Sequence, residues 1–294
     1  MKSIHTRTLR ETDADFLKHL DSQVKWGFSL KIPKIFLEFS NSAYLAEDSV
    51  TQQPYGIVLT YYYPPFTGWI GFLIVDEKYQ KRGIGRMLFL KAVNHLLEIG
   101  CKEILLDAVP NVTKFYEKYQ FLQIENSFRL KALRSSLVES LISSPQSTRV
   151  QSEHLGDIRQ FDLSIFGAER IKIFQIMLKN PKSEGAIFIQ DNMVKGYGFI
   201  RHSENSFSIG PLVAESSPIA LDLISRLIQI GTPLCRECEW ILVGVTETSN
   251  IPLQFFIKLG FTEYNYSYRM RYGPNQRENR KSNLIYSITA PAMG

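Results

Sequence analysis

The first half of the chain alternates between two hydrophobic patterns. Short runs rich in Tyr, Val, Ile and Leu are typical of buried strands, and longer amphipathic segments between them are typical of helices. Strands are expected at Ala43–Glu47, Tyr55–Tyr63, Gly68–Val75 and Glu103–Val109, and helices at Asp13–Val24, Gly83–Ile99 and Val112–Tyr119. This order predicts an α/β fold, in which helices flank a mixed β-sheet.

The second half repeats the pattern of the first. Phe115–Lys131 aligns without a gap on Phe255–Arg271, and five of the aligned residues are identical. A turn-forming cluster, Ser143–Ser147, lies between the two copies. The chain is therefore predicted to form two tandem domains of one fold, at residues 1–134 and 149–294.

Composition narrows the class of protein. The chain has 294 residues and a net charge of +5, and its Lys and Arg residues form no stripe with interleaved aromatics, so we expect no nucleic-acid partner. It has no apolar run of about eighteen residues, so no membrane span is expected. Three cysteines and a polar N-terminus favour a reducing, cytoplasmic location. A monomer and a homodimer both remain open.

The cysteines include one pair at CxxC spacing, Cys235 and Cys238. A zinc site needs further ligands, and neither a second CxxC nor a His pair follows. A structural role is favoured over a redox pair. The histidines show no spacing typical of metal ligands, so no metal is predicted.

The sharpest local signal is Gln80-x-x-Gly83-x-Gly85, which follows the strand that ends at Val75. The free N–H groups of the following helix start favour an anion, especially a phosphate, and glycines allow it to approach closely. Basic side chains at Lys81, Arg82 and Arg86 add to the positive charge. The pattern is neither a Rossmann fingerprint nor a P-loop, and alone it is also compatible with an ordinary strand-to-helix turn.

This segment resembles the Q/R-x-x-G-x-G/A motif of the GNAT acyltransferase superfamily, and Phe115–Phe121 resembles the later LYxKxGF segment of that family. Lys25–Phe28 is similar to the GWN stretch of tandem GNAT proteins of the YitH type. Asp162–Arg170 and Ile209–Ala214 are similar to their C-terminal GNAT-like domain. The resemblance spans nearly the whole chain.

The resemblance implies acetyl-CoA as cofactor and no metal. The strand before the motif would pair with the pantetheine arm, and the motif would hold the pyrophosphate. The implied cofactor-binding residues are Leu73, Ile74, Val75, Gln80, Lys81, Arg82, Gly83, Ile84, Gly85, Arg86 and Asn111. Asn111 lies closer to Tyr116 than the family spacing, and Gln120 replaces a glycine of the family pattern.

The resemblance also implies the chemistry. Tyr116 matches the tyrosine that protonates the departing thiolate, after direct attack of an amine on the thioester. The strand Gly68–Val75 has no glutamate to act as base. Asp107 on the neighbouring strand is one candidate base, because burial would raise its pKa; a chain of water molecules is the other.

The second copy lacks this machinery. Ala214–Ala220 has no glycine pair, and Phe256 stands in place of Tyr116. We expect this copy to shape the pocket of a small-molecule primary amine, with Trp26, Arg170 and Arg201 as candidate acceptor ligands, although either arginine fits a structural role equally well. A CoA-binding protein without turnover and a protein or peptide N-acetyltransferase are the alternatives.

Overall fold

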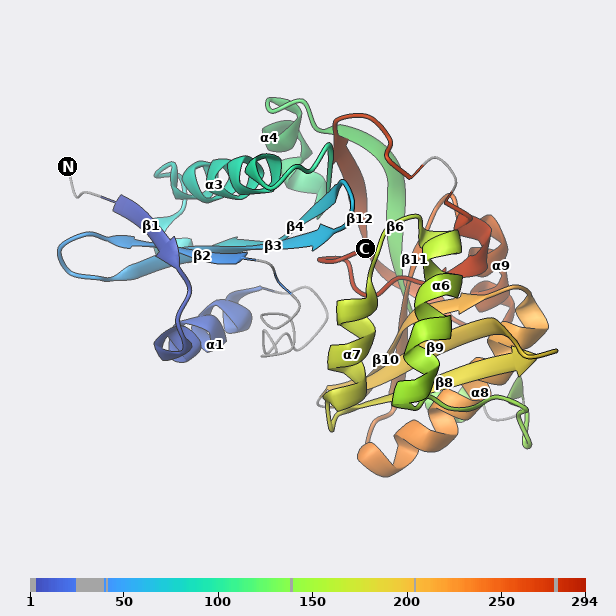
Figure 1. The fold of residues 1–294 in the computed structure, drawn as a ribbon. Helices are drawn as coiled ribbons and strands as arrows, with labels where there is room; N and C mark the ends of the chain where they lie inside the picture. The colour runs from blue at the N-terminus through green and yellow to red at the C-terminus, as the bar shows by residue number, and fades with distance from the viewer. Residues whose placement is uncertain (1–3, 25–39, 41, 138–139, 204, 278–279) are drawn as a thin grey trace.

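The protein folds around a single continuous sheet of 13 strands (Figure 1). The computed structural model describes residues 4–24, 40, 42–137, 140–203, 205–277 and 280–294. The strands are β1 (Ile4–Thr8), β2 (Ser42–Asp48), β3 (Pro54–Tyr63), β4 (Thr67–Val75), β5 (Glu103–Ala108), β6 (Leu122–Leu133), β7 (Thr148–Arg149), β8 (Ser183–Gln190), β9 (Met193–Ser203), β10 (Ser206–Ala214), β11 (Trp240–Thr246), β12 (Thr262–Tyr272) and β13 (Ile285–Ser287). The mixed parallel and antiparallel sheet that the sequence predicts is confirmed.

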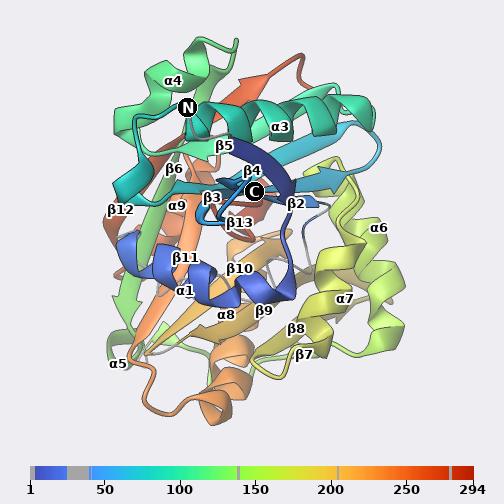
Figure 2. The same ribbon diagram turned by 90° about the vertical axis from the view of Figure 1, so that its left-hand side faces the viewer.

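Helices cover both faces of the sheet in each half (Figures 1 and 2). In the N-terminal half, α3 packs on β2, β3 and β4. In the C-terminal half, α8 packs on β8, β9 and β10, while α6 and α7 lie on the other side. The helices are α1 (Ala14–Gln23), α3 (Ile84–Glu98), α4 (Thr113–Glu117), α5 (Arg134–Leu137), α6 (Leu155–Phe166), α7 (Ile171–Lys179), α8 (Ser217–Gly231) and α9 (Asn250–Lys258).

The two halves exchange their last strands. The order across the sheet is β1-β2-β3-β4-β5-β12-β6-β11-β10-β9-β8-β7. Strand β12 of the second copy therefore lies between β5 and β6 of the first copy, and β6 in turn pairs with β11 of the second copy. In Figure 1, green β6 and red β12 run side by side between the halves. The predicted boundary between residues 134 and 149 separates two sequence repeats, but the sheet continues across it.

The similarity of the two repeats explains why this exchange is possible. Strands β6 and β12 both follow a short helix and carry Ser and Arg at matching positions, Ser127 and Arg129 against Ser267 and Arg269. Each strand therefore presents similar side chains to its neighbours in the exchanged position. The pairing of β6 with β12 is antiparallel and extends over nearly the full length of both strands.

The hydrophobic core also joins the halves. One cluster of buried side chains includes Leu45, Ile57 and Trp69 from the first half together with Phe166 and Phe174 from the second. These side chains are nearly inaccessible to solvent. Because burial of apolar area is the main stabilising term in folding, the two halves are expected to unfold together.

The predicted strands and helices of the first half are confirmed with ends shifted by a few residues. Strand β6 was not predicted, because Glu125 and Arg129 interrupt its apolar pattern. Both side chains are buried within polar contacts instead of lying on a solvent face.

The strand exchange predicts that neither half folds alone. A fragment of residues 1–140 would leave one edge of β5 and both edges of β6 without partners, and unpaired edges favour aggregation. We expect this fragment to show no cooperative unfolding in circular dichroism and to elute as aggregates. Co-expression with residues 141–294 should restore a soluble complex. A fragment 1–140 that melts cooperatively as a monomer would contradict the exchange.

Candidate functional site

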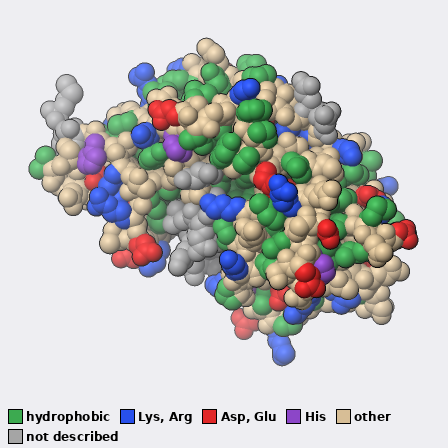
Figure 3. Space-filling view, viewed as in Figure 1, with side chains coloured by type: hydrophobic (Ala, Val, Ile, Leu, Met, Phe, Trp, Pro, Cys, Tyr) green, Lys and Arg blue, Asp and Glu red, His purple; other side chains and the backbone are tan. Residues whose placement is uncertain are grey.

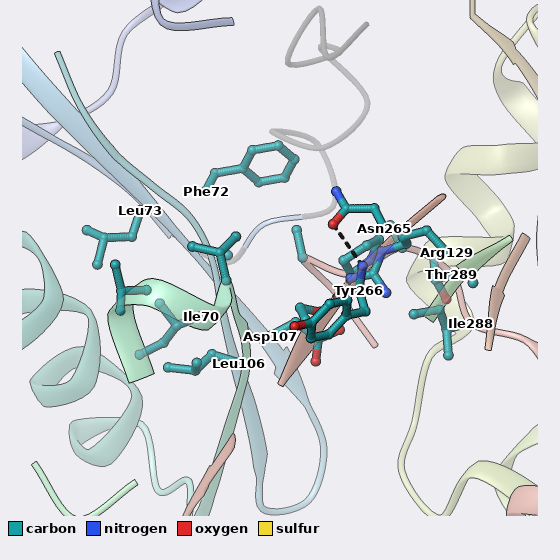
Figure 4. Close-up of a pocket in the computed structure, with 18 of the residues that line it drawn as sticks. Ile70, Phe72, Leu73, Leu106, Asp107, Arg129, Asn265, Tyr266, Ile288 and Thr289 are labelled. Carbon is teal, nitrogen blue, oxygen red and sulfur yellow. Dashed lines mark hydrogen bonds and ion pairs between the residues drawn. The ribbon is translucent and has the colours of Figure 1, made fainter. Parts of the chain in front are cut away.

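A cavity of about 750 Å³ lies between the two halves. Its walls come from β4, β5, the loop before α3 and helix α4 on one side, and from β6, β9 to β12 and the C-terminal segment on the other. Figure 4 shows apolar side chains from β4 and β5 at one end, including Ile70, Leu73 and Leu106, and polar groups around Arg129 and Asn265 at the other. The cavity therefore has an apolar arm and a polar end.

The apolar arm begins where β4 and β5 separate. These strands pair in parallel only from Thr67 to Trp69 on β4, opposite Glu103 to Leu105 on β5. Beyond that point β4 has no described partner on its β5 side, although it still pairs with β3 as far as Val75. This edge of β4 lines the cavity, where an extended ligand can pair with backbone N–H and C=O groups.

The loop Gln80–Arg86 lies beside this edge. Gly83 adopts a left-handed conformation with φ of 81° and precedes α3. A Cβ atom at Gly83 would meet nothing within 4 Å, and one at Gly85 would meet only the Val75 side chain at 3.6 Å. No described residue accepts a hydrogen bond from the backbone N–H groups of residues 81–86. This open cluster of donors, with Lys81 and Arg86 at the cavity, suits a phosphate group.

Contacts from several elements hold the loop in place. Asp76 is buried and accepts hydrogen bonds from the Lys78 backbone N–H at 3.0 Å and from His19 of α1 at 3.0 Å. The Gln80 side chain donates to the backbone carbonyl of Val75 at 3.1 Å. The Gln80 of the motif therefore ties the loop back to the end of β4, which explains why an amide side chain fits this position.

Tyr116 of α4 lines the same cavity. Its ring lies within an aromatic cluster and packs against Phe89 at 5.3 Å and Phe115 at 5.1 Å between ring centroids. Burial raises the pKa of its phenol, so the hydroxyl keeps its proton at neutral pH. No described residue hydrogen-bonds to this hydroxyl, which leaves it available to a group in the cavity.

Asp107 lies at the polar end, within a buried group of charges. Arg269 of β12 donates to both carboxylate oxygens, at 2.9 and 3.3 Å, and Arg129 of β6 lies 3.5 Å away. Arg269 also donates to Glu125 at 3.2 Å. Burial opposes ionisation of Glu125, but Arg269 and Arg280 outweigh it and hold its pKa below the ordinary value. At the junction of β5, β12 and β6, the negative charges of two carboxylates thus face the positive charges of two guanidinium groups.

The polar wall of the cavity comes largely from residues that the sequence did not single out. Asn265 and Tyr266 belong to β12, and the Asn265 side chain accepts a hydrogen bond from the Tyr266 backbone N–H at 2.8 Å (Figure 4). Thr289 belongs to the C-terminal segment, whose residues 288–292 all line the cavity. The repeat pointed to the equivalence of Arg129 and Arg269, but no local pattern marks the C-terminal segment.

The predicted cofactor residues fall into two groups. Leu73, Val75, Gln80, Lys81, Ile84, Gly85 and Arg86 line the cavity. Ile74 points into the core instead, and Arg82 packs over the ring of Tyr79 at 5.3 Å. Asn111 is exposed and lies outside the cavity lining, so its predicted contact with the cofactor has no support from the geometry.

The predicted acceptor ligands differ in their surroundings. Arg201 lines the cavity and donates to the Thr289 carbonyl at 2.6 Å, and burial lowers its pKa to about 10. The structure does not support Arg170 as an acceptor ligand. It is buried away from the cavity, where α6 and α7 enclose it in the core, and it forms an ion pair with Asp162 at 2.6 Å. Trp26 lies outside the described residues.

The second copy has the same strand separation, but its own chain fills it. Strand β10 pairs with β11 only from Ser206 to Ser208, and β13 then pairs with β10 at Leu212 and Val213. On its other side, the Ile288 backbone N–H donates to the Gly244 carbonyl of β11 at 2.8 Å. No extended ligand can enter that gap while β13 occupies it. Of the two gaps, the one between β4 and β5, beside Tyr116, is therefore the open one.

Comparisons with known proteins agree with this arrangement. The acetyltransferase (GNAT) family model matches residues 10–121, and a second acetyltransferase (GNAT) domain model matches residues 158–287. The chain is 27% identical to the uncharacterized N-acetyltransferase YitH of Bacillus subtilis over 158 residues, which cover 54% of this chain and 55% of YitH. It is 22% identical to holothin acyltransferase of Pseudoalteromonas sp. over 269 residues, which cover 90% of this chain and 86% of that protein.

Solved structures show the same fold. A putative acetyltransferase from Pyrococcus horikoshii superposes with a TM-score of 0.79 at 21% identity, covering 100% of this chain and 97% of that one. A tandem GNAT protein from the clavulanic acid biosynthesis pathway gives a TM-score of 0.68 at 12% identity, covering 93% and 100% of the two chains. At these identities the likeness concerns the fold alone.

The buried charge group yields a stability prediction. Asp107→Asn removes the charge that faces Arg269 and Arg129, so we expect the free energy of unfolding in urea to fall by about 3 kcal/mol. Asp15→Asn is the matched control, because Asp15 pairs with Lys18 on the exposed surface of α1 and should change nothing measurable. Equal stability of the two variants would show that Asp107 does not carry the ion pair.

Proposed function

Because this chain belongs to the GNAT superfamily as a tandem protein, and is an acyl-CoA-dependent N-acyltransferase, we propose that it transfers an acetyl group from acetyl-CoA to the primary amine of a small molecule. The observation that carries the proposal is one cavity that joins the edge of β4 beyond Trp69, the first turn of α3 after Gly83 and the side chain of Tyr116. The second half then serves as a wall of the acceptor site.

The described residues fit the chemistry of CoA. The open space at Gly83 and Gly85, with the unused N–H groups of residues 81–86, suits a pyrophosphate. Lys81 and Arg86 supply positive charge beside it. The separated edge of β4 suits an extended pantetheine arm with amide groups, and the apolar side chains of Ile70, Leu73 and Leu106 would cover it.

Bound acetyl-CoA would supply an activated thioester. The backbone N–H groups on the open edge of β4 can stabilise the negative charge that develops on the carbonyl oxygen during attack. Tyr116 can donate its proton to the sulfur as the carbon–sulfur bond breaks, because burial raises the pKa of the phenol and so keeps that proton in place at neutral pH. Holding the amine against the thioester supplies much of the acceleration.

For the base, the surroundings of Asp107 favour water. Both oxygens of this carboxylate accept hydrogen bonds from Arg269, and Arg129 lies beside one of them. Because guanidinium groups occupy both carboxylate oxygens, neither oxygen is directed at an amine in the cavity. We therefore propose that Asp107 holds Arg129 and Arg269 in place. A water molecule at the polar end then removes the proton of the amine.

The polar end also suggests the kind of acceptor. Lys182 and Arg201 line it together with Arg129, so the cationic groups exceed the carboxylates there. We propose an acceptor with a carboxylate near Arg201 in addition to its amine, since guanidinium groups bind carboxylates well. On the face shown in Figure 3, basic side chains are scattered among acidic and apolar ones, which offers no continuous surface for a nucleic acid.

The proposed function is tested by measuring CoA release from acetyl-CoA with two matched sets of amines. One set consists of amino acids, and the other consists of the corresponding amines without the carboxylate. Turnover that is faster with the amino acids supports both the reaction and the acceptor class. Binding of acetyl-CoA without turnover on any small amine or peptide would favour a CoA-binding protein instead.

The role of Tyr116 predicts a selective loss of turnover. Tyr116→Phe removes the proton donor and keeps the packing of the ring, so we expect kcat to fall about 100-fold with an unchanged Kd for acetyl-CoA. Tyr119→Phe is the matched control, since Tyr119 belongs to the same aromatic cluster but lies outside the cavity lining. The assignment fails if both variants turn over at the rate of the unaltered protein.

The loop predicts a selective loss of cofactor affinity. Gly85→Val places a branched side chain where the pyrophosphate would lie. The protein itself has room for this side chain, because the nearest atom, on Val75, lies 3.6 Å from the added Cβ. We expect the affinity for CoA to fall at least about tenfold, as for loss of a charge-assisted contact, without loss of fold. Gly156→Val, on the open surface of α6, is the control. Isothermal titration with CoA measures both, and equal affinities would exclude the loop as the cofactor site.

A further inference from the structure

Three side chains that commonly bind metals meet at the edge of the C-terminal half. His202 lies near the end of β9, and Cys235 and Cys238 lie in the loop before β11. One ring nitrogen of His202 and both sulfur atoms lie within 4.8 Å of one another. The sequence shows only the CxxC pair, because His202 is more than thirty residues away along the chain.

Backbone pairing brings these segments together. His202 pairs with Phe207 across the β9–β10 hairpin, and Ser206 pairs in parallel with Trp240 of β11. The Glu239 backbone N–H donates to the Asn205 carbonyl at 3.0 Å, which fixes the cysteine loop against the hairpin. The sheet pairing and this loop contact together hold the three side chains close without help from a ligand.

The cysteine loop is also tied to the strand exchanged from the first half. Arg134, directly after β6, donates through its side chain to the carbonyl of Arg236 at 2.8 Å. Its own backbone N–H donates to the Glu239 carbonyl at 2.7 Å. The carbonyls of the loop are thus turned toward Arg134, and the two sulfur atoms lie on the side that faces His202.

We propose that His202, Cys235 and Cys238 form a tetrahedral Zn²⁺ site, with a water molecule as the fourth ligand. Two thiolates and an imidazole are ligands that Zn²⁺ prefers in proteins, at about 2.3 Å for sulfur and 2.0–2.1 Å for nitrogen. Tetrahedral geometry at those lengths places the ligand atoms about 3.5–3.8 Å apart. The present spacing within 4.8 Å needs a closure of about 1 Å, which rotation of the side chains can supply.

The surroundings suit an imidazole ligand. His202 offers an imidazole nitrogen, whose lone pair binds a metal when the ring is neutral. Its Nδ1 atom is buried and has no hydrogen-bond partner among the described residues. Burial raises the pKa of the Cys238 thiol to about 12, so binding of Zn²⁺ has to displace the thiol protons into solvent.

The site would fix one end of the reaction cavity. His202 lines that cavity together with Arg201 and Lys182. A metal that joins the β9–β10 hairpin to the loop before β11 would hold the strand carrying Arg201 in one position. The proposal concerns metal binding and stability, and it stands independently of the acetyl acceptor.

The test uses the full chain without a histidine tag, purified under reducing conditions. Mass spectrometry of the metal content should find about one Zn²⁺ per chain, and removal with a chelator should lower the Tm. His202→Asn and Cys235→Ser should each weaken Zn²⁺ binding at least about tenfold. Loss of a residue that only hydrogen-bonds to a metal ligand already lowers metal affinity by about that factor. Affinity is measured by competition with a chromophoric chelator.

Cys101→Ala is the matched control, since Cys101 is a buried cysteine of the first half that is remote from the cluster. It should keep the Zn²⁺ content of the unaltered protein. Cobalt added to the metal-free chain gives a second readout that does not depend on stability, namely thiolate-to-cobalt absorption that Cys235→Ser diminishes. The proposal is overturned if the unaltered chain binds Zn²⁺ no more tightly than His202→Asn. It is also overturned if Cys235 and Cys238 remain joined by a disulfide after purification under reducing conditions.

Discussion

The pairing of β12 with both β5 and β6 is the constraint on which the rest of the structure depends. It brings Arg269 from the second repeat against Asp107 and Glu125 from the first, at 2.9 and 3.2 Å. The first repeat supplies Arg129 beside Asp107 at 3.5 Å, and the exchanged strand supplies the guanidinium group that bonds to both carboxylates. The same exchange places Asn265 and Tyr266 opposite the open edge of β4. Folding of the two halves and assembly of the cavity are therefore one event.

The difference between the halves follows from what fills the gap beside the fourth strand of each repeat. In the first half, β4 and β5 separate after Trp69, and the gap opens into the cavity. In the second half, β10 and β11 separate in the same way, but β13 pairs with β10 inside the gap. After filling it, the chain continues through residues 288–292 to line the cavity of the first half. One C-terminal segment thus closes one site and shapes the other.

The buried charges have a structural role and a chemical role. Asp107 and Arg129 line the cavity, yet their hydrogen bonds are directed to residues of β6 and β12. Polar groups held in this manner change position little, which suits a site where alignment of two reactants supplies most of the acceleration. The proposed Zn²⁺ site would act in the same sense at this polar end, by fixing the hairpin that carries Arg201.

The sequence by itself determined most elements of the first half, the tandem repeat and the loop Gln80–Gly85, because these depend on local hydrophobic period, glycine and helix-start chemistry. It also marked Tyr116, through a motif on one short helix. Tertiary structure alone decided which strand lies beside β5, since two similar repeats offer two equivalent strands and only long-range packing chooses between them. It likewise turned Arg170 into a core residue, placed Arg269 on Asp107 and brought His202 to the CxxC loop. These relations join residues far apart in the chain, and no local pattern records them.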